Sequence, residues 1–87
     1  MSDLLTKIFN HFGTEAQMKK LAEECAEFLE AYLKNDTSRA LAEIPDLNII
    51  TGQFLQSSAY LQEIAAEKIQ RTLERIESKY YDKKNLS

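Results

Sequence analysis

Residues that interrupt regular structure are scarce in this chain, which contains two glycines and one proline among 87 residues. Folds with many strands need turns at short intervals, and glycine and proline are the residues that most often form them. Hydrophobic residues make up 44% of the sequence, which excludes a disordered composition. We therefore predict an all-α bundle of about four helices, formed by one domain over residues 1–79 and followed by a polar tail over 80–87.

Hydrophobic periodicity defines the first two predicted helices. The first spans residues 2–12 and ends at Gly13. Thr14 begins the second, with Gln17 placed to complete a capping box. Its apolar stripe, in which Cys25 is read as a buried small hydrophobe, comprises Met18, Leu21, Ala22, Cys25, Phe28, Leu29, Tyr32 and Leu33. A second line beside this stripe comprises Gln17, Lys20, Glu24, Glu27 and Ala31.

The third predicted helix runs over residues 38–56, after a polar turn. Its apolar residues are spread widely around it, which predicts the central and most buried helix. Pro45 lies inside this range, so we expect a kink there; the alternative is a late start that places the proline in the first turn. Ser57 or Ser58 caps a last helix over 59–79.

Two acidic pairs repeat the same spacing on the second and third helices. Glu24 and Glu27 lie one turn apart, and so do Glu43 and Asp46. The gap between the pairs suits a short helix–helix turn, so the two acidic faces are expected to meet across an antiparallel hairpin. Facing carboxylates repel one another unless a cation lies among them, and oxygen ligands favour Mg²⁺ or Mn²⁺. Taken alone, each pair also fits an ordinary solvated helix face.

The order E-E-x-x-E followed by E-x-x-D resembles the MazG-like all-α nucleoside triphosphate pyrophosphohydrolases. The flanking residues are also similar, upstream and downstream: Gln17-x-x-Lys20-x-x-Glu23-Glu24 and Lys68-x-x-Arg71-x-x-x-Arg75. The resemblance covers roughly residues 8–77. It implies Mg²⁺-dependent hydrolysis of a nucleoside triphosphate to the monophosphate and pyrophosphate, with clearance of non-standard nucleotides as one role.

The resemblance also assigns roles to the acidic residues. Glu24, Glu27, Glu43 and Asp46 become the metal ligands, and Glu23, Glu24 and Glu27 the catalytic set, with Glu23 orienting water or accepting its proton. In the family, a helix-compatible residue more often stands where this chain has Pro45.

Four other residues are candidates for contact with substrate. Lys68 and Arg71 are placed by the resemblance against triphosphate oxygens, although a solvated basic face is the alternative. Gln17 is a candidate for hydrogen bonding to the base or sugar, and Lys20 for contact with a phosphate. Solvent exposure, or an i,i+4 pair between Lys20 and Glu24, accounts for these two residues equally well.

The net charge of −3 argues against binding to a nucleic-acid polymer, and no apolar run is long enough to span a membrane. The single cysteine fits a reducing cytoplasm. A short chain with exposed apolar seams is expected to form at least a dimer, and the resemblance implies a homodimer or homotetramer. Two rival functions remain open: a non-catalytic oligomeric helical interaction module, and a related phosphoribosyl-ATP pyrophosphohydrolase or all-α dUTPase.

Overall fold

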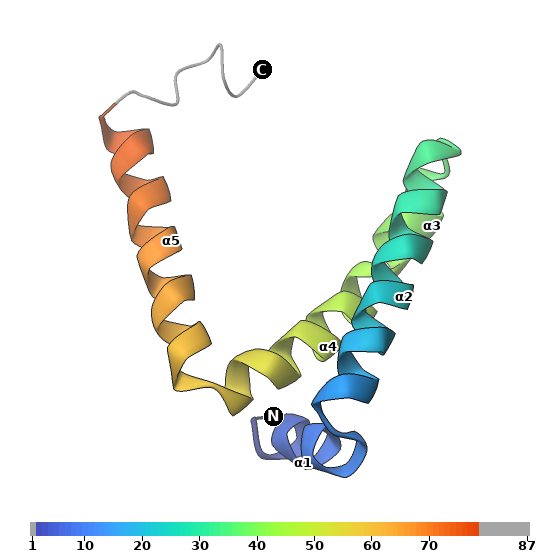
Figure 1. The fold of residues 1–87 in the computed structure, drawn as a ribbon. Coiled ribbons are helices and arrows are strands. Elements are labelled where there is room, and N and C mark those ends of the chain that lie inside the picture. Colours follow the sequence, from blue (N-terminus) through green and yellow to red (C-terminus); the bar gives the residue numbers. More distant parts are fainter. Residues whose placement is uncertain (1, 79–87) are drawn as a thin grey trace.

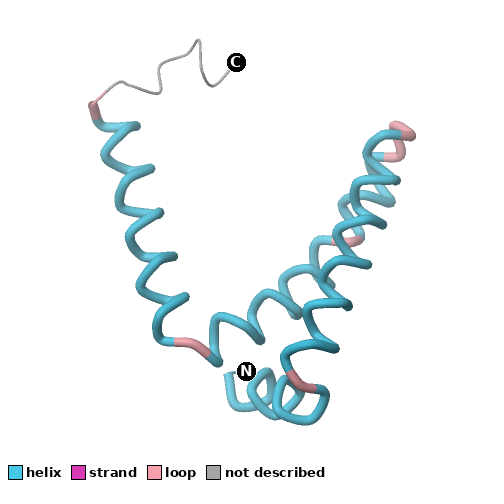
Figure 2. The backbone as a smooth tube through the Cα atoms, viewed as in Figure 1, coloured by secondary structure: helices cyan, strands magenta, loops and turns pink. Residues whose placement is uncertain are grey.

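The computed structural model describes residues 2–78, and within that range every regular element is an α-helix (Figures 1 and 2). The helices are α1 (Ser2–Phe12), α2 (Thr14–Leu33), α3 (Thr37–Ala42), α4 (Ile44–Ser57) and α5 (Ala59–Glu77). The all-α prediction is confirmed. The helix predicted over 38–56 is divided into α3 and α4, and the predicted tail at 80–87 lies outside the described residues.

The turn between α2 and α3 is built by three consecutive polar residues. Lys34 caps the C-terminus of α2, and Asn35 adopts a left-handed conformation with φ of 61°. Asparagine tolerates this conformation better than most side chains, and helices often end in this way. Asp36 then caps α3, because its carboxylate accepts a hydrogen bond of 3.1 Å from the backbone N–H of Arg39. The chain reverses within these residues, which sets α2 against α3 and α4.

Pro45 lies in the first turn of α4, where its missing N–H breaks no helical hydrogen bond. The predicted helix is interrupted close to Pro45, but as a break at Glu43 between α3 and α4 and not as a kink within one continuous helix; Pro45 falls in a first turn, as the alternative had it. Glu43 occupies the single turn residue between α3 and α4. The proline thus places an acidic residue at a helix junction, on the side of the hairpin that faces α2.

Helix α4 packs against each of the other four helices, which confirms its predicted central position. Against α1, close approach depends on Gly52, because a Cβ at this position would lie 3.1 Å from Leu5 Cδ1. The rings of Phe9 and Phe54 pack edge to face nearby, with centroids 5.1 Å apart. Helix α1 therefore packs across α4 at the base of the hairpin (Figure 1).

The side of α2 that is buried differs from the predicted one. Gln17, Glu24 and Ala31, spaced two turns apart, are its buried residues. Much of the predicted apolar stripe is exposed in this chain, including Leu33 at 68% and the thiol-bearing Cys25. The capping box is also wrong, because Gly13 is the N-cap of α2 and makes no side-chain cap bond. The polar line beside the stripe is what faces α3 and α4.

Helix α5 begins as predicted, with Ser58 Oγ accepting a 3.2 Å hydrogen bond from the backbone N–H of Leu61. Beyond its first turns it extends away from α2 and α3, and its backbone approaches only α4 (Figure 1). None of its described residues is buried. Among residues 2–78, no helix combines the length and apolar character needed to cross a bilayer.

Candidate acidic site

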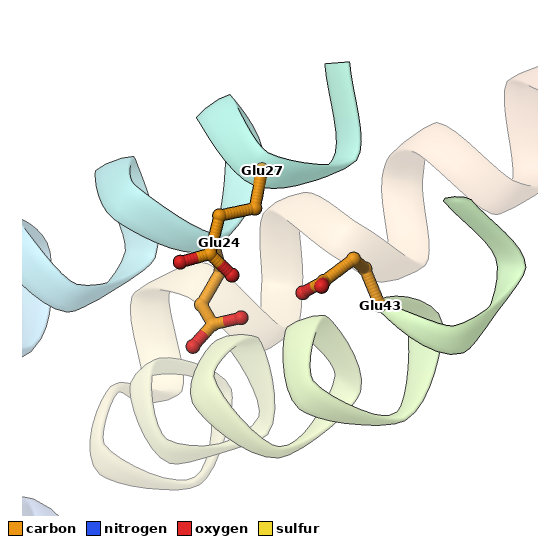
Figure 3. Close-up of side chains that lie close together, drawn as sticks. All are labelled: Glu24, Glu27 and Glu43. Carbon is orange, nitrogen blue, oxygen red and sulfur yellow. The ribbon is translucent and has the colours of Figure 1, made fainter. Parts of the chain in front are cut away.

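Three carboxylates converge between α2 and the junction of α3 and α4 (Figure 3). Glu24 and Glu27 extend from adjacent turns of α2, and Glu43 approaches from the opposite side of the hairpin. One oxygen from each of the three lies within 4.8 Å of the others. Three of the four predicted metal ligands are therefore brought together, in an arrangement that offers only oxygen donors.

The interior of this trio is enclosed, whereas one side is open. Glu24 is 8% exposed and Glu43 is half-buried. In each of these two residues, Oε2 is shut off from solvent and has no hydrogen-bond partner within the described range 2–78. Buried carboxylate oxygens without donors are costly when ionised. The side chain of Glu27 is exposed and gives the trio its access to solvent.

The pKa of Glu43 is raised above its ordinary value. Burial is the main cause, followed by a side-chain hydrogen bond with the carboxyl group of Glu24 and by the negative charges of Glu27, Glu24 and Asp46. All of these act in the same direction, because each disfavours the ionised form of Glu43 relative to its protonated form. Electrostatics in this hairpin thus favour a proton or a cation at Glu43.

Lys20 forms an ion pair with the trio, with Nζ 3.5 Å from Glu24 Oε1. This is the i,i+4 pair expected from the sequence. The Lys20 side chain is 58% exposed, so its ammonium group stays at the edge of the site and leaves Glu24 Oε2 without a partner. Contact of Lys20 with a phosphate stays a prediction.

Asp46, the fourth predicted ligand, lies beside the trio rather than within it. Its side chain is exposed, and its charge contributes to the raised pKa of Glu43. Asp46 and Glu24 line the same groove, which has a volume of about 760 Å³. Glu23, predicted to act on water, is exposed and also lines this groove.

The groove lies among α1, α2 and α4 and combines apolar walls with polar groups. Its lining comprises Ile8, Phe12, Ala16, Gln17, Lys19, Lys20, Glu23, Glu24, Asp46, Ile49, Ile50 and Gln53. Most of the predicted site residues on α2 and α4 therefore open onto one continuous depression. Concave sites of this kind, mainly apolar with a few polar groups, are typical of small-molecule binding.

Gln53 is a site residue that the sequence reasoning missed. Gln17 Nε2 donates a buried hydrogen bond of 2.7 Å to Gln53 Oε1, across 36 residues of chain. Gln17 stands two turns before Glu24 on α2, and Gln53 two turns after Asp46 on α4. In an antiparallel helix pair, residues that lie the same distance along the two helices in opposite chain directions face each other. The matching two-turn spacings, Glu24 to Gln17 and Asp46 to Gln53, were therefore the sequence signal that could have identified Gln53.

Lys68 and Arg71 are not brought to the acidic trio within one chain. They lie on α5, are exposed, and line a separate small depression of about 280 Å³ with Thr72 and Arg75. Because α5 extends away from α2 and α3, their predicted contact with a triphosphate requires a different placement of α5 relative to the trio (Figure 1).

Comparison with known proteins gave no match. No family model matches the chain, and neither do curated proteins or solved structures at the level of significance applied. The acidic trio and the groove beside it are therefore the features of this chain that point to a function.

Proposed function

We propose that Glu24, Glu27 and Glu43 bind a divalent cation, Mg²⁺ or Mn²⁺, and that the chain hydrolyses nucleoside triphosphates to the monophosphate and pyrophosphate. One observation carries the proposal: Oε2 of Glu24 and Oε2 of Glu43 are enclosed within a trio of acids, and neither has a hydrogen-bond partner among residues 2–78. A cation would offset this concentration of charge.

The donor set supports a hard cation over the alternatives. The trio offers carboxylate oxygens alone, whereas zinc and copper sites usually include imidazole or thiolate. Protonation of Glu43 relieves part of the repulsion, but it leaves Glu24 and Glu27 side by side. Asp46 lines the groove next to Glu24, and we propose that it joins the ligand set after a change of side-chain rotamer.

In the proposed reaction, a water oxygen attacks the α-phosphorus and the bond to the pyrophosphate oxygen breaks. A bound divalent ion supplies Lewis acidity: it offsets phosphate charge and lowers the pKa of water. Glu23, exposed at the groove, accepts the proton that water loses. Lys20, which reaches the same groove, contacts a phosphate oxygen and opposes the charge that develops there.

We also propose that the working form is a homodimer. A second apolar groove, of about 640 Å³, lies among α2, α4 and α5 and is lined largely by Met18, Leu21, Phe54, Leu55, Leu61 and Ile64. The outer half of α5 carries an uncovered apolar seam on the same chain: Ile69, Leu73 and Ile76. A chain that exposes both an apolar groove and an apolar helix offers two complementary surfaces to a second copy of itself, which supports a second copy as the occupant.

Dimerisation also gives Lys68 and Arg71 a route to the substrate. The trio and Asp46 concentrate negative charge on one part of the chain, and α5 presents three basic side chains on another. An α5 supplied by the partner would place these cations against phosphates held at the acidic site. An arginine in that position can hold two phosphate oxygens at once.

The proposed activity is tested by measuring pyrophosphate release from a panel of common and modified nucleoside triphosphates, with Mg²⁺ or Mn²⁺. Wild type is compared with Glu27→Gln and with Glu30→Gln. Glu30 is a matched control, because it lies one turn from Glu27 but pairs with Lys34 at 2.8 Å on an exposed surface. We expect Glu27→Gln to lose more than about a hundredfold in activity, since even outer partners of metal ligands cost 10–100-fold, and Glu30→Gln to match wild type.

No release by folded wild-type protein from any triphosphate would overturn the hydrolase proposal, and the oligomeric interaction module would then be favoured. Inclusion of dUTP and phosphoribosyl-ATP in the panel separates the related enzyme classes. The single cysteine, which cannot form an intramolecular disulfide, supports a cytoplasmic setting for this activity.

A further inference from the structure

The hydrogen-bonded amides of Gln17 and Gln53 form the most enclosed polar contact in the larger groove. Gln17 is 7% exposed and Gln53 is 3% exposed, and both line the depression that leads to Glu24 and Asp46. Their 2.7 Å hydrogen bond links α2 to α4. This bond helps to hold the hairpin together, but it uses only one donor and one acceptor of the two amide side chains.

Two hydrogen-bonding groups of this pair are left over. Gln17 Oε1 and Gln53 Nε2 make no hydrogen bond with any residue in the described part of the chain. Neither atom is fully enclosed, because the unpartnered polar side-chain atoms shut off from solvent there belong to Glu24 and Glu43. If both amides are turned over, the pair still bonds internally and still leaves one acceptor and one donor. A remaining acceptor and donor are therefore a property of the hydrogen-bonded pair in both assignments that keep the bond.

The walls next to the amides are apolar. Ile8 and Phe12 contribute from α1, and Ile49 and Ile50 from α4. Phe12 is 59% exposed, so its ring offers a surface on which a flat ring can stack. A planar heteroaromatic group with a donor next to an acceptor along one edge matches both the walls and the amides.

We propose that the Gln17–Gln53 pair hydrogen-bonds the edge of a nucleobase, whose phosphates extend along the groove toward Glu24 and Asp46. The inference rests on the proposed function for the identity of the phosphates, but the base-binding element stands on its own geometry. It adds Gln53 as a specificity-determining residue. It also defines the ligand class as a base with adjacent donor and acceptor atoms, which separates nucleotides from inorganic polyphosphates and sugar phosphates.

The test uses a double variant, Gln17→Met with Gln53→Met, in the full chain. Replacing both partners of a buried hydrogen bond by apolar groups of similar shape is close to neutral for stability, so the fold should persist. Gln56→Met is the matched control, because Gln56 is an exposed glutamine on the same helix that does not line the groove. Thermal unfolding of all three proteins establishes that they are equally folded.

The first readout compares hydrolysis of nucleoside triphosphates with hydrolysis of inorganic tripolyphosphate, which lacks a base. We expect kcat/KM for the preferred nucleotide to fall by at least about tenfold in the double variant, from loss of two hydrogen bonds, with tripolyphosphate unaffected. An equal loss on both substrates, or no loss on either, would overturn the proposal, because a structural role for the amides does not distinguish the two substrates.

The second readout does not require activity. Free nucleosides are added to ¹⁵N-labelled protein, and the side-chain amide signals of Gln17 and Gln53 are followed by NMR. We expect these signals to shift with a nucleoside and not with tripolyphosphate, and binding to weaken by about tenfold when the donor nitrogen of the base is methylated. Shifts without hydrolysis would refute the proposed function and leave the base-binding element standing. No shift with any nucleoside would refute the base-binding element itself.

Discussion

Glu24 and Glu43 face each other across the hairpin, and each holds Oε2 enclosed and without a hydrogen-bond donor. Glu24 comes from the middle of α2, and Glu43 from the single residue that joins α3 to α4. The hairpin therefore brings together two groups that repel each other when ionised. Its stability should respond to whatever neutralises them.

Mg²⁺ or Mn²⁺ should raise the melting temperature of the wild-type protein. At ten times the dissociation constant, linkage gives about 1.4 kcal/mol, or roughly 5–10 °C for a domain of this size. The double variant Glu24→Gln/Glu43→Gln should lose this response, whereas Glu30→Gln should retain it. The measurement is thermal unfolding by circular dichroism across a titration of each ion. Equal stabilisation of wild type and the double variant would show that the ion acts elsewhere.

The metal-free protein should become less stable as pH rises above about 4.5, the ordinary pKa of a glutamate. Because the pKa of Glu43 is raised in the folded chain, the native state keeps a proton that the unfolded chain has already released. The free energy of unfolding therefore falls as pH rises, until pH passes the raised pKa of Glu43. Above that pH this group causes no further fall. Urea unfolding between pH 4 and 8 measures this slope, and Glu43→Gln should flatten it.

Glu30→Gln provides the control for that experiment. Lys34 lowers the pKa of Glu30 through a hydrogen bond and its charge, which is the opposite direction from Glu43. Removing Glu30 should leave the fall in stability above pH 4.5 intact. If the pH dependence of stability disappears in Glu30→Gln and persists in Glu43→Gln, Glu43 is not the group responsible for it.

Ile50→Ala should destabilise the chain by about 2–4 kcal/mol, since deletion of buried methyl groups costs this much in a packed core. Ile50 is 3% exposed on the central helix, whereas its neighbour Ile49 is 44% exposed. Ile49→Ala should therefore cost less than about 1 kcal/mol. Chemical unfolding of both variants checks the prediction, and equal losses would show that the packing of α4 is misassigned.

Charges placed on the outer seam of α5 should prevent self-association. Ile69→Glu with Leu73→Glu puts two carboxylates into the proposed contact, which should weaken a dimer by roughly a hundredfold or more. Gln70→Glu is the control, because Gln70 is exposed and bonded to Glu74 within α5. Light scattering over a concentration series gives the mass. A monomeric wild type, or a dimer untouched by both substitutions, would refute this contact.

Helix boundaries were predictable where a local signal acts alone. Gly13 and Ser58 end and begin helices through their own backbone and side-chain chemistry, and the structure has both where they were expected. Pro45 was ambiguous, because the same ring is harmful in a helix interior and favourable in a first turn. Only packing of the hairpin selects between these two outcomes.

The buried side of α2 could not be predicted from its periodicity. The stripe containing Met18 and Leu29 is the more apolar side, but the neighbours available within one chain cover Gln17, Glu24 and Ala31 instead. Periodicity indicates that an apolar face exists and not which partner covers it. The convergence of Glu24, Glu27 and Glu43 was predictable because it follows from register across a short turn. Gln53 was missed because a single amide in an apolar helix has no motif of its own.

The antiparallel register of α2 and α4 makes the groove a molecular ruler. Two helical turns separate the amides from the acids on both helices, which corresponds to about 10 Å at 1.5 Å per residue. A molecule that contacts both ends must span this length. Inorganic phosphate and short sugar phosphates fall short of it, so the hairpin would select its ligands first by their length and only then by their chemistry.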